Sequence, residues 1–138
     1  MADNPEQGPA GGVTPHLTIR DKRADEAIGF YQAAFGAEVL TRIPADDGER
    51  LMHVHLRLNG GSVMLNDDFP EYSGAPSAAP AAVTLHIQVA DPDRWFERAV
   101  AAGAEVTMPL ADQFWGDRYG QVVDPFGHRW SIGGPVKG

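Results

Sequence analysis

The sequence predicts an α+β protein made of two tandem βαβββ modules. Near the start of the chain, residues 13–17 read VTPHL, and residues 83–87 repeat this as VTLHI. Each copy leads into a helix-like segment that ends in the tetrad Gly-Ala-Glu-Val. The chain therefore contains two copies of one supersecondary unit. Because a unit this small cannot cover both faces of its own sheet, we expect the two to pair, with a ligand cavity between them.

Composition limits the possible partners. The chain has 138 residues, of which 43% are hydrophobic and 22% charged, as expected for one soluble domain. The formal net charge of −8 disfavours binding to nucleic acid and to anionic membranes. There is no cysteine, hence no disulfide and no thiolate nucleophile. Without a signal-like or membrane-spanning stretch, the chain is expected to be cytoplasmic.

The first module is predicted over residues 13–66, after a disordered leader at 1–12 that is rich in Pro and Gly. Apolar and polar residues alternate from 13 to 19, which is typical of a half-buried strand. Asp21 is expected to cap a helix that runs to Phe35 and stops at Gly36. Three strands follow, which we place at 38–43, 50–58 and 62–66.

The second module is predicted over residues 83–132, and a linker at 67–82 joins it to the first within a single domain, 13–138. Three prolines interrupt the linker, so no regular structure is expected in it. A strand at 83–89 precedes a helix that Asp91 caps and that ends at Gly103. A strand at 105–108, a loop at 109–116 and a hairpin of 118–123 with 128–132 complete the module.

Three motifs in this order resemble the vicinal oxygen chelate superfamily of glyoxalases, bleomycin resistance proteins and dioxygenases, and its PhnB-like branch in particular. They are FYQAAFGA at 30–37, DQFWGDRYG at 112–120 and DPFGH at 124–128. The resemblance implies two sheets that curl into an open, barrel-like cleft, and a homodimer. It also implies a small-molecule ligand, because members are either metal-dependent enzymes or metal-free proteins that sequester drugs.

The resemblance places the polar faces of the first strands toward the cleft. These faces carry Thr14 and His16 in one module and Thr84, His86 and Gln88 in the other. In metal-dependent relatives the first strands supply His or Gln and the last strands supply Glu. Here His16 and His86 match.

The same alignment puts Leu65 and Ser131 where the carboxylates would stand. A divalent ion such as Zn, Ni, Mn or Fe would then lack its usual ligands. The histidines are either weak metal ligands or polar cavity walls, and we favour walls. Only a shift in strand register would bring a substitute inward, and the candidates are His53, His55, Asp67, Asp68 and His128.

The loop before the last hairpin carries Phe114 and Trp115, which are interpreted as a wall for an aromatic ligand. The alternative is a closed turn in which Asp117 pairs with Arg118. Arg129 shares a strand face with Ser131 and could meet an anionic ligand. Residues 69–72 are either a lid or an anchor for the linker.

Two functions remain open from the sequence. The favoured one is a binding protein of the bleomycin-resistance kind, which encloses a small molecule without the full metal site. The alternative is a metal-dependent lyase, isomerase, transferase or dioxygenase that uses His16 and His86 as ligands. The negative charge favours cationic ligands and the first function. No catalytic residue can be assigned.

Overall fold

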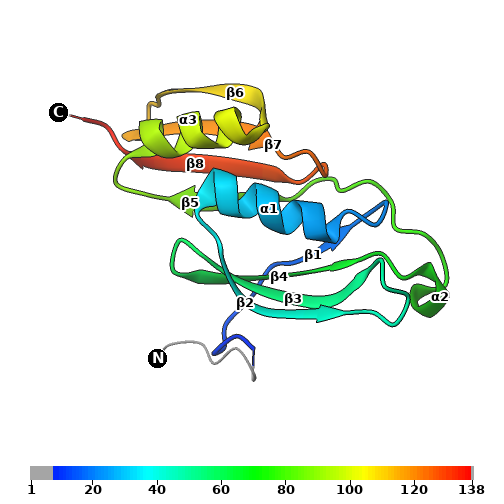
Figure 1. The fold of residues 1–138 in the computed structure, drawn as a ribbon. Coiled ribbons are helices and arrows are strands. Elements are labelled where there is room, and N and C mark those ends of the chain that lie inside the picture. Colours follow the sequence, from blue (N-terminus) through cyan, green and yellow to red (C-terminus); the bar gives the residue numbers. More distant parts are fainter. Residues whose placement is uncertain (1–7, 138) are drawn as a thin grey trace. The chain divides into compact units, whose positions relative to one another are not determined.

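The computed structural model describes residues 8–137 and divides into two compact units (Figure 1). The first unit holds the chain up to Gln32 together with 36–78, and the second holds 33–35 with the chain from 79 onward. Residues 1–7 of the predicted leader lie outside the described residues. No helix in the described part is long and apolar enough to cross a membrane.

The first unit contains a four-stranded sheet. Its elements in chain order are β1 (His16–Ile19), α1 (Ala24–Phe35), β2 (Glu38–Pro44), β3 (Leu51–Leu58) and β4 (Gly61–Asp67). The strands lie in the order β1-β4-β3-β2. β1 is parallel to β4, and the other two pairs are antiparallel.

The second unit repeats this arrangement with β5 (Thr84–Gln88), α3 (Pro92–Ala102), β6 (Glu105–Asp112), β7 (Asp117–Val123) and β8 (Arg129–Pro135). The strand order is β5-β8-β7-β6, again with one parallel pair, β5 and β8. Both sheets are open. The same order and strand directions in both units confirm the predicted α+β fold of two βαβββ modules.

Helix α1 ends as predicted but begins differently. Gly36 takes the left-handed conformation at φ 66° and stops the helix. Asp21, predicted as the cap, lies instead in a turn with φ 64°, so that prediction is wrong. The N–H of Ala24 donates to the carboxylate of Asp67 at 2.9 Å. A residue 43 positions along the chain therefore caps the helix.

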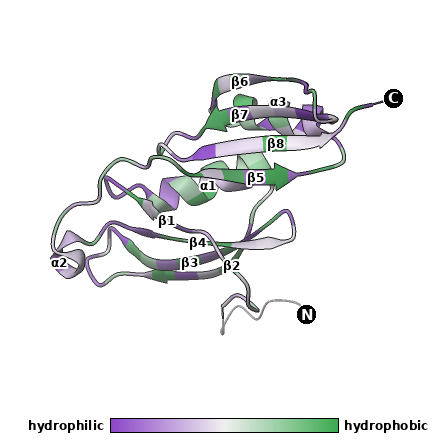
Figure 2. Ribbon diagram, turned by 180° about the vertical axis from the view of Figure 1, so that it is seen from behind, coloured by the Kyte–Doolittle hydropathy of each residue, from purple (hydrophilic) through white to green (hydrophobic). Residues whose placement is uncertain are grey.

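The linker is more regular than predicted. One turn of helix, α2 (Pro70–Ser73), begins at a proline and ends at Gly74, whose φ is 94°. Proline fits the first helical position because its missing N–H has no intrahelical partner there. Figure 2 shows α2 in hydrophilic colours, whereas green and purple bands alternate along β3 and β4. No α2 residue is buried, so polar contacts, described below, hold it in place.

Two strands also differ from the prediction. β6 continues to Asp112 through Pro109, which the sequence placed in a loop. β6 is an edge strand with two register shifts, and an edge position tolerates a residue that cannot donate a ladder hydrogen bond. In β3, apolar residues at every second position from Met52 to Leu58 would be expected to share the buried face, but Met52 is 44% exposed, while Leu51 is 3% exposed. The β2–β3 register shifts at the same place.

Each sheet has one buried face. In the first unit it carries Leu17, Ile19, Val54, Leu56 and Leu65. In the second it carries Ile87, Val122, Trp130 and Ile132, and the ring of Phe35 packs 4.9 Å from that of Trp130. Because side chains alternate across a strand, the polar residues of each first strand lie together on the opposite face.

Candidate functional site

His86 is the centre of the polar face of the second sheet. It lies beside Ser131 in the parallel pairing of β5 with β8, and its Nδ1 is 2.7 Å from the Ser131 hydroxyl. Its Nε2 donates to the amide oxygen of Gln88, also at 2.7 Å. The ring stacks on Tyr119 with a centroid distance of 5.8 Å and an interplanar angle of 19°. Both ring nitrogens and one ring face are thus engaged within one module.

A glycine makes room for this ring. A Cβ at Gly133 would lie 3.0 Å from Cε1 of His86 and 3.4 Å from Cδ2 of Tyr119. The backbone of β8 therefore approaches the stacked pair more closely than a larger residue would permit. Gly133 belongs to this site, although neither the composition nor a sequence motif indicated it.

The aromatic contacts continue from His86 to the tip of the loop between β6 and β7. Trp115 packs edge to face on Tyr119 at 5.5 Å, and Phe114 packs in the same way on Trp115 at 5.1 Å. Phe114 is 97% exposed and Trp115 is 51% exposed. We call His86, Tyr119, Trp115 and Phe114 the aromatic row. Large exposed aromatics at a loop tip are typical of a binding surface.

The alternative of a closed Asp117–Arg118 turn is wrong. Arg118 pairs with Asp93 at 2.5 Å and with Asp112 at 3.1 Å. These two carboxylates raise the pKa of the guanidinium, mainly through their hydrogen bonds. Arg118 thereby ties β6 and β7 to the start of α3 and leaves the loop tip to the aromatic residues.

Thr84 and Arg129 lie farther along the same face. They pair in register at the beginning of β5 and β8, and both are exposed. Arg129 therefore shares the face of Ser131, as the alternation predicted. It presents a positive charge at one edge of this polar face.

In the first sheet, the corresponding face is arranged around His16. Its Nε2 donates to the amide oxygen of Asn66 at 2.7 Å, and the Asn66 amide donates to the carbonyl of Asp67, also at 2.7 Å. His16 is exposed, and Thr14, which precedes β1, is half-buried. Asn66 holds His16 here by a contact that the sequence analysis did not anticipate.

The neighbour of His16 on β4 is Met64, not Leu65. Leu65 pairs with Leu17 and is fully buried on the opposite face, so the alignment that placed it at a ligand position was one residue out of register. In the second sheet the position beside His86 is Ser131, as expected. The two positions where metal-dependent relatives carry glutamate therefore hold a thioether and a hydroxyl.

The other histidines of the first sheet do not replace these ligands. His55 is fully buried and shares a 2.9 Å hydrogen bond with the Ser62 hydroxyl. Burial lowers the pKa of His53, with smaller effects from His16 and His55. Among residues 8–137, no group of three or more His, Cys, Asp or Glu side chains is placed to hold a metal ion.

The nearby carboxylates have structural partners. Asp67 is fully buried and accepts hydrogen bonds from the backbone N–H groups of Ala24 and Leu51 at 2.9 and 2.7 Å. Asp68 accepts from the N–H and the hydroxyl of Ser77, both at 2.8 Å, and these bonds lower its pKa. Neither acid is available to complete a metal site.

The DPFGH motif also has a structural role. The carboxylate of Asp124 accepts from the backbone N–H groups of Phe126 and His128 and from the indole N–H of Trp130, at 2.9 to 3.0 Å. The motif therefore shapes the turn before β8, and His128 contributes its backbone to that turn.

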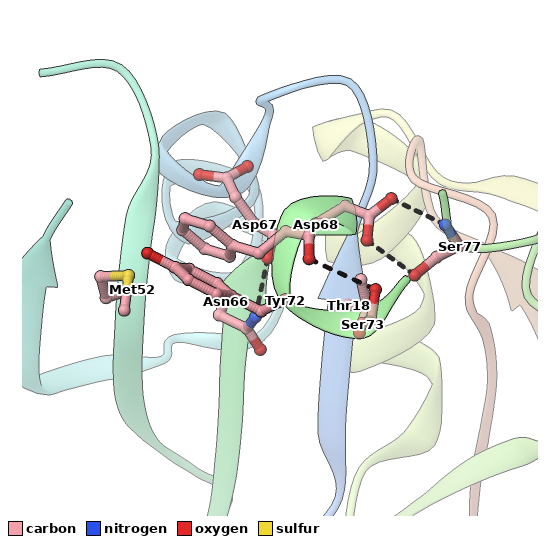
Figure 3. Close-up of a pocket in the computed structure, with 9 residues that line it drawn as sticks. Thr18, Met52, Asn66, Asp67, Asp68, Tyr72, Ser73 and Ser77 are labelled. Carbon is pink, nitrogen blue, oxygen red and sulfur yellow. Dashed lines mark hydrogen bonds between the residues drawn. The ribbon is translucent and has the colours of Figure 1, made fainter. Parts of the chain in front are cut away.

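A pocket of about 380 Å³ lies at the carboxyl ends of β1 and β4, beneath α2 (Figure 3). Its lining includes Thr18, Asn66, Met52, Phe69 and Tyr72. The Asp68–Ser77 hydrogen bonds close the segment around α2. From the sequence, residues 69–72 were expected to form either a lid or an anchor for the linker. In the structure, hydrogen bonds hold this segment over a pocket.

The donor set does not fit the metal centre of the family. Metal-dependent sites need about three protein ligands with an open position for water or substrate. Beside the two histidines stand Met64 and Ser131, and Gln88 already accepts from Nε2 of His86. These side chains therefore do not supply the ligands that the metal centre of the family needs.

The fold of the two units agrees with the comparisons to known proteins. Residues 14–132 match the family described as Glyoxalase/Bleomycin resistance protein/Dioxygenase superfamily. The chain belongs to this superfamily. It is 51% identical over 130 residues to Mb0911c, an uncharacterized protein of Mycobacterium bovis, which covers 91% of this chain and 84% of that protein.

Solved structures of other proteins share the fold. PA1353 from Pseudomonas aeruginosa superposes with a TM-score of 0.77 at 24% identity, covering 93% of this chain and all of that one. TioX from Micromonospora sp. ML1 superposes with a TM-score of 0.66 at 30% identity, covering 91% and 100%.

Proposed function

We propose that this superfamily member binds a small planar ligand on the aromatic row and does so without a resident metal ion. The observation that carries the proposal is the environment of His86. Ser131 stands where a carboxylate would be needed, and Gln88 and Tyr119 hold the ring in a fixed position. A histidine held in this way is suited to orient a ligand by hydrogen bonding.

The protonation of His86 follows from its partners. As the Gln88 amide is oriented, its oxygen can only accept, so Nε2 of the neutral ring carries the proton. Nδ1 then accepts from the Ser131 hydroxyl. A ligand acceptor that displaces Gln88 would receive the same N–H, and its ring would stack on Trp115 or Tyr119. Such aromatic pairs contribute about 0.5–1.5 kcal/mol beyond area burial.

The metal part of the proposal is tested by elemental analysis of protein purified without chelator and then incubated with Zn, Ni or Mn salts. We expect less than one equivalent of each metal after gel filtration. A tightly bound equivalent that is lost in the double variant His16→Ala/His86→Ala would overturn the proposal and favour the metal-dependent enzyme.

The ligand part is tested by fluorescence quenching, with acridine as a neutral planar probe. Quenching should be saturable, and it should weaken in Trp115→Ala and in His86→Ala. Trp95→Phe is the matched control, because Trp95 lies on α3 and takes no part in the ring contacts described for the aromatic row. Equal loss in the control and in Trp115→Ala, or no saturable quenching in the wild type, would refute the aromatic row as a binding surface.

Four points stay predictions from the sequence. They are that the protein forms a homodimer, that it is cytoplasmic, that it belongs to the PhnB-like branch, and that His16 and His86 face each other across one cavity. We propose that Arg129, whose charge lies on the same face as Ser131, binds a negatively charged group of the ligand.

A further inference from the structure

A second hollow lies next to the pocket beneath α2. It has a volume of about 370 Å³, and Met52, Phe69 and Tyr72 line both spaces. Its other walls come from the turn that follows β2, including Asp46 and Asp47. We call it the Asp46 hollow. It belongs entirely to the first unit, so it involves none of the residues of the aromatic row.

Arg50 fixes the walls of the Asp46 hollow. Its guanidinium donates to both oxygens of Glu71, at 2.9 and 2.6 Å, and to Asp47 at 2.6 Å. It also lies 4.2 Å from the centroid of the Phe69 ring. One cation thus joins the turn after β2 to α2. These contacts pair the charge of Arg50 with two carboxylates and link the walls of the hollow to one another.

The charge balance of the two hollows is negative. Four carboxylates line them, from Asp46, Asp47, Asp67 and Asp68, against the single guanidinium of Arg50 among the described lining residues. Two of these carboxylates, Asp46 and Asp47, lie in the Asp46 hollow, where Arg50 is the one cation among the described lining residues. Hydrogen bonds from Arg50 and Glu49 keep the pKa of Asp47 well below its usual range. It therefore stays charged at neutral pH.

Two groups in the Asp46 hollow are available to a ligand. Within residues 8–137, neither the Asp46 carboxylate nor the Tyr72 hydroxyl has a hydrogen-bonding partner. Tyr72 is 77% exposed, and in Figure 3 its side chain extends from α2 toward Met52. Phe69 already carries the Arg50 cation against its ring. The Tyr72 ring packs beside Phe69 at 5.8 Å and is otherwise largely exposed. A carboxylate, an aromatic face and a thioether are the groups that bind organic cations.

We propose that the Asp46 hollow is a binding site for an organic cation, in which Asp46 pairs with an ammonium or amidinium group and Tyr72 and Met52 contact the attached apolar part. The volume falls within the range of small-molecule sites. The net charge of −8 draws cations toward the protein over longer distances.

The test compares benzylamine, which is a cation at neutral pH, with benzyl alcohol, its neutral counterpart. Binding to the full chain is followed by ¹⁵N-HSQC titration. Benzylamine should shift the amides of Asp46, Met52 and Tyr72 in a saturable manner. Asp46→Asn and Tyr72→Leu should each weaken its binding by about threefold or more. Both side chains are exposed, so neither change should impair folding.

Glu38→Gln is the matched control. It removes one negative charge at the opposite end of β2 and should leave the affinity unchanged. The proposal is overturned if benzyl alcohol binds equally well, if Glu38→Gln weakens binding as much as Asp46→Asn, or if no saturable shifts appear. Shifts confined to residues 114–121 would also overturn it. The acridine test reports on Trp115, whereas the benzylamine test reports on Asp46, Met52 and Tyr72. Either proposal can therefore fail while the other holds.

Discussion

Replacement of Asp67 by alanine should be one of the most damaging single changes in the first unit. The carboxylate is fully buried and accepts two backbone hydrogen bonds, from Ala24 at the start of α1 and from Leu51 at the start of β3. Alanine would leave both N–H groups buried without an acceptor. Hydrogen bonds to a charged group contribute about 1.5–3 kcal/mol each, so the expected loss is about 3–6 kcal/mol. This is a large part of the stability of a typical domain.

Urea unfolding followed by circular dichroism measures the loss, and hydrogen exchange at the Ala24 and Leu51 amides locates it. Asp67→Asn keeps one acceptor oxygen and should lose about half as much. Asp46→Asn is the control, because this exposed side chain has no partner in the described residues; its effect should stay within about 0.5 kcal/mol. If Asp67→Ala costs less than about 1 kcal/mol, or changes metal content while stability is kept, the structural role of Asp67 is refuted.

Two further predictions concern stability. Hydrogen bonds from Arg50 lower the pKa of Glu71 to about 2 from the ordinary 4.5, so the stabilisation from this carboxylate is present above pH 4.5 and is lost as the pH falls toward 2. The urea midpoints of the wild type and of Glu71→Gln should therefore converge over that interval, and a constant difference would contradict the pairing. Gly134→Ala should destabilise the protein by about 3 kcal/mol, because its Cβ would lie 2.0 Å from the carbonyl oxygen of Val89. Gly29→Ala, at an exposed position of α1 with nothing within 4 Å, should instead gain up to about 1 kcal/mol in thermal unfolding. Similar effects of the two changes would contradict the close approach of Gly134 to Val89.

The sequence by itself determined the two modules, the end of α1 and the start of α3. The repeated VTxHx segments predicted the duplication, and the strand orders of the two sheets confirm it. Gly36 and Asp91 mark a helix end and a helix start through contacts within a few residues. Such signals can be read from the chain because all their partners lie within one turn of helix.

The candidate site could be predicted only in part. His86, Gln88 and Ser131, which the sequence analysis selected as candidate site residues, contact one another in the structure. Tyr119 and Gln121 were not selected as part of this face. The Gln121 amide donates to the Tyr119 hydroxyl at 3.0 Å, and both residues alternate with Gly120 and Val122 along β7 and so share a face. Had that alternation been followed through the last hairpin, it would have identified them.

Only the tertiary structure decided which residue stands beside His16 and which carboxylates are available. A slip of one residue exchanges the two faces of a strand, and the pairing with β1 put Met64 rather than Leu65 on the polar face. Asp67 caps a helix that begins 43 residues earlier, and no local pattern indicates such a contact. Periodicity reports which residues share a face, whereas register and long-range hydrogen bonds depend on how separate segments pair, so the chemistry of this site could be read only once the sheets were assembled.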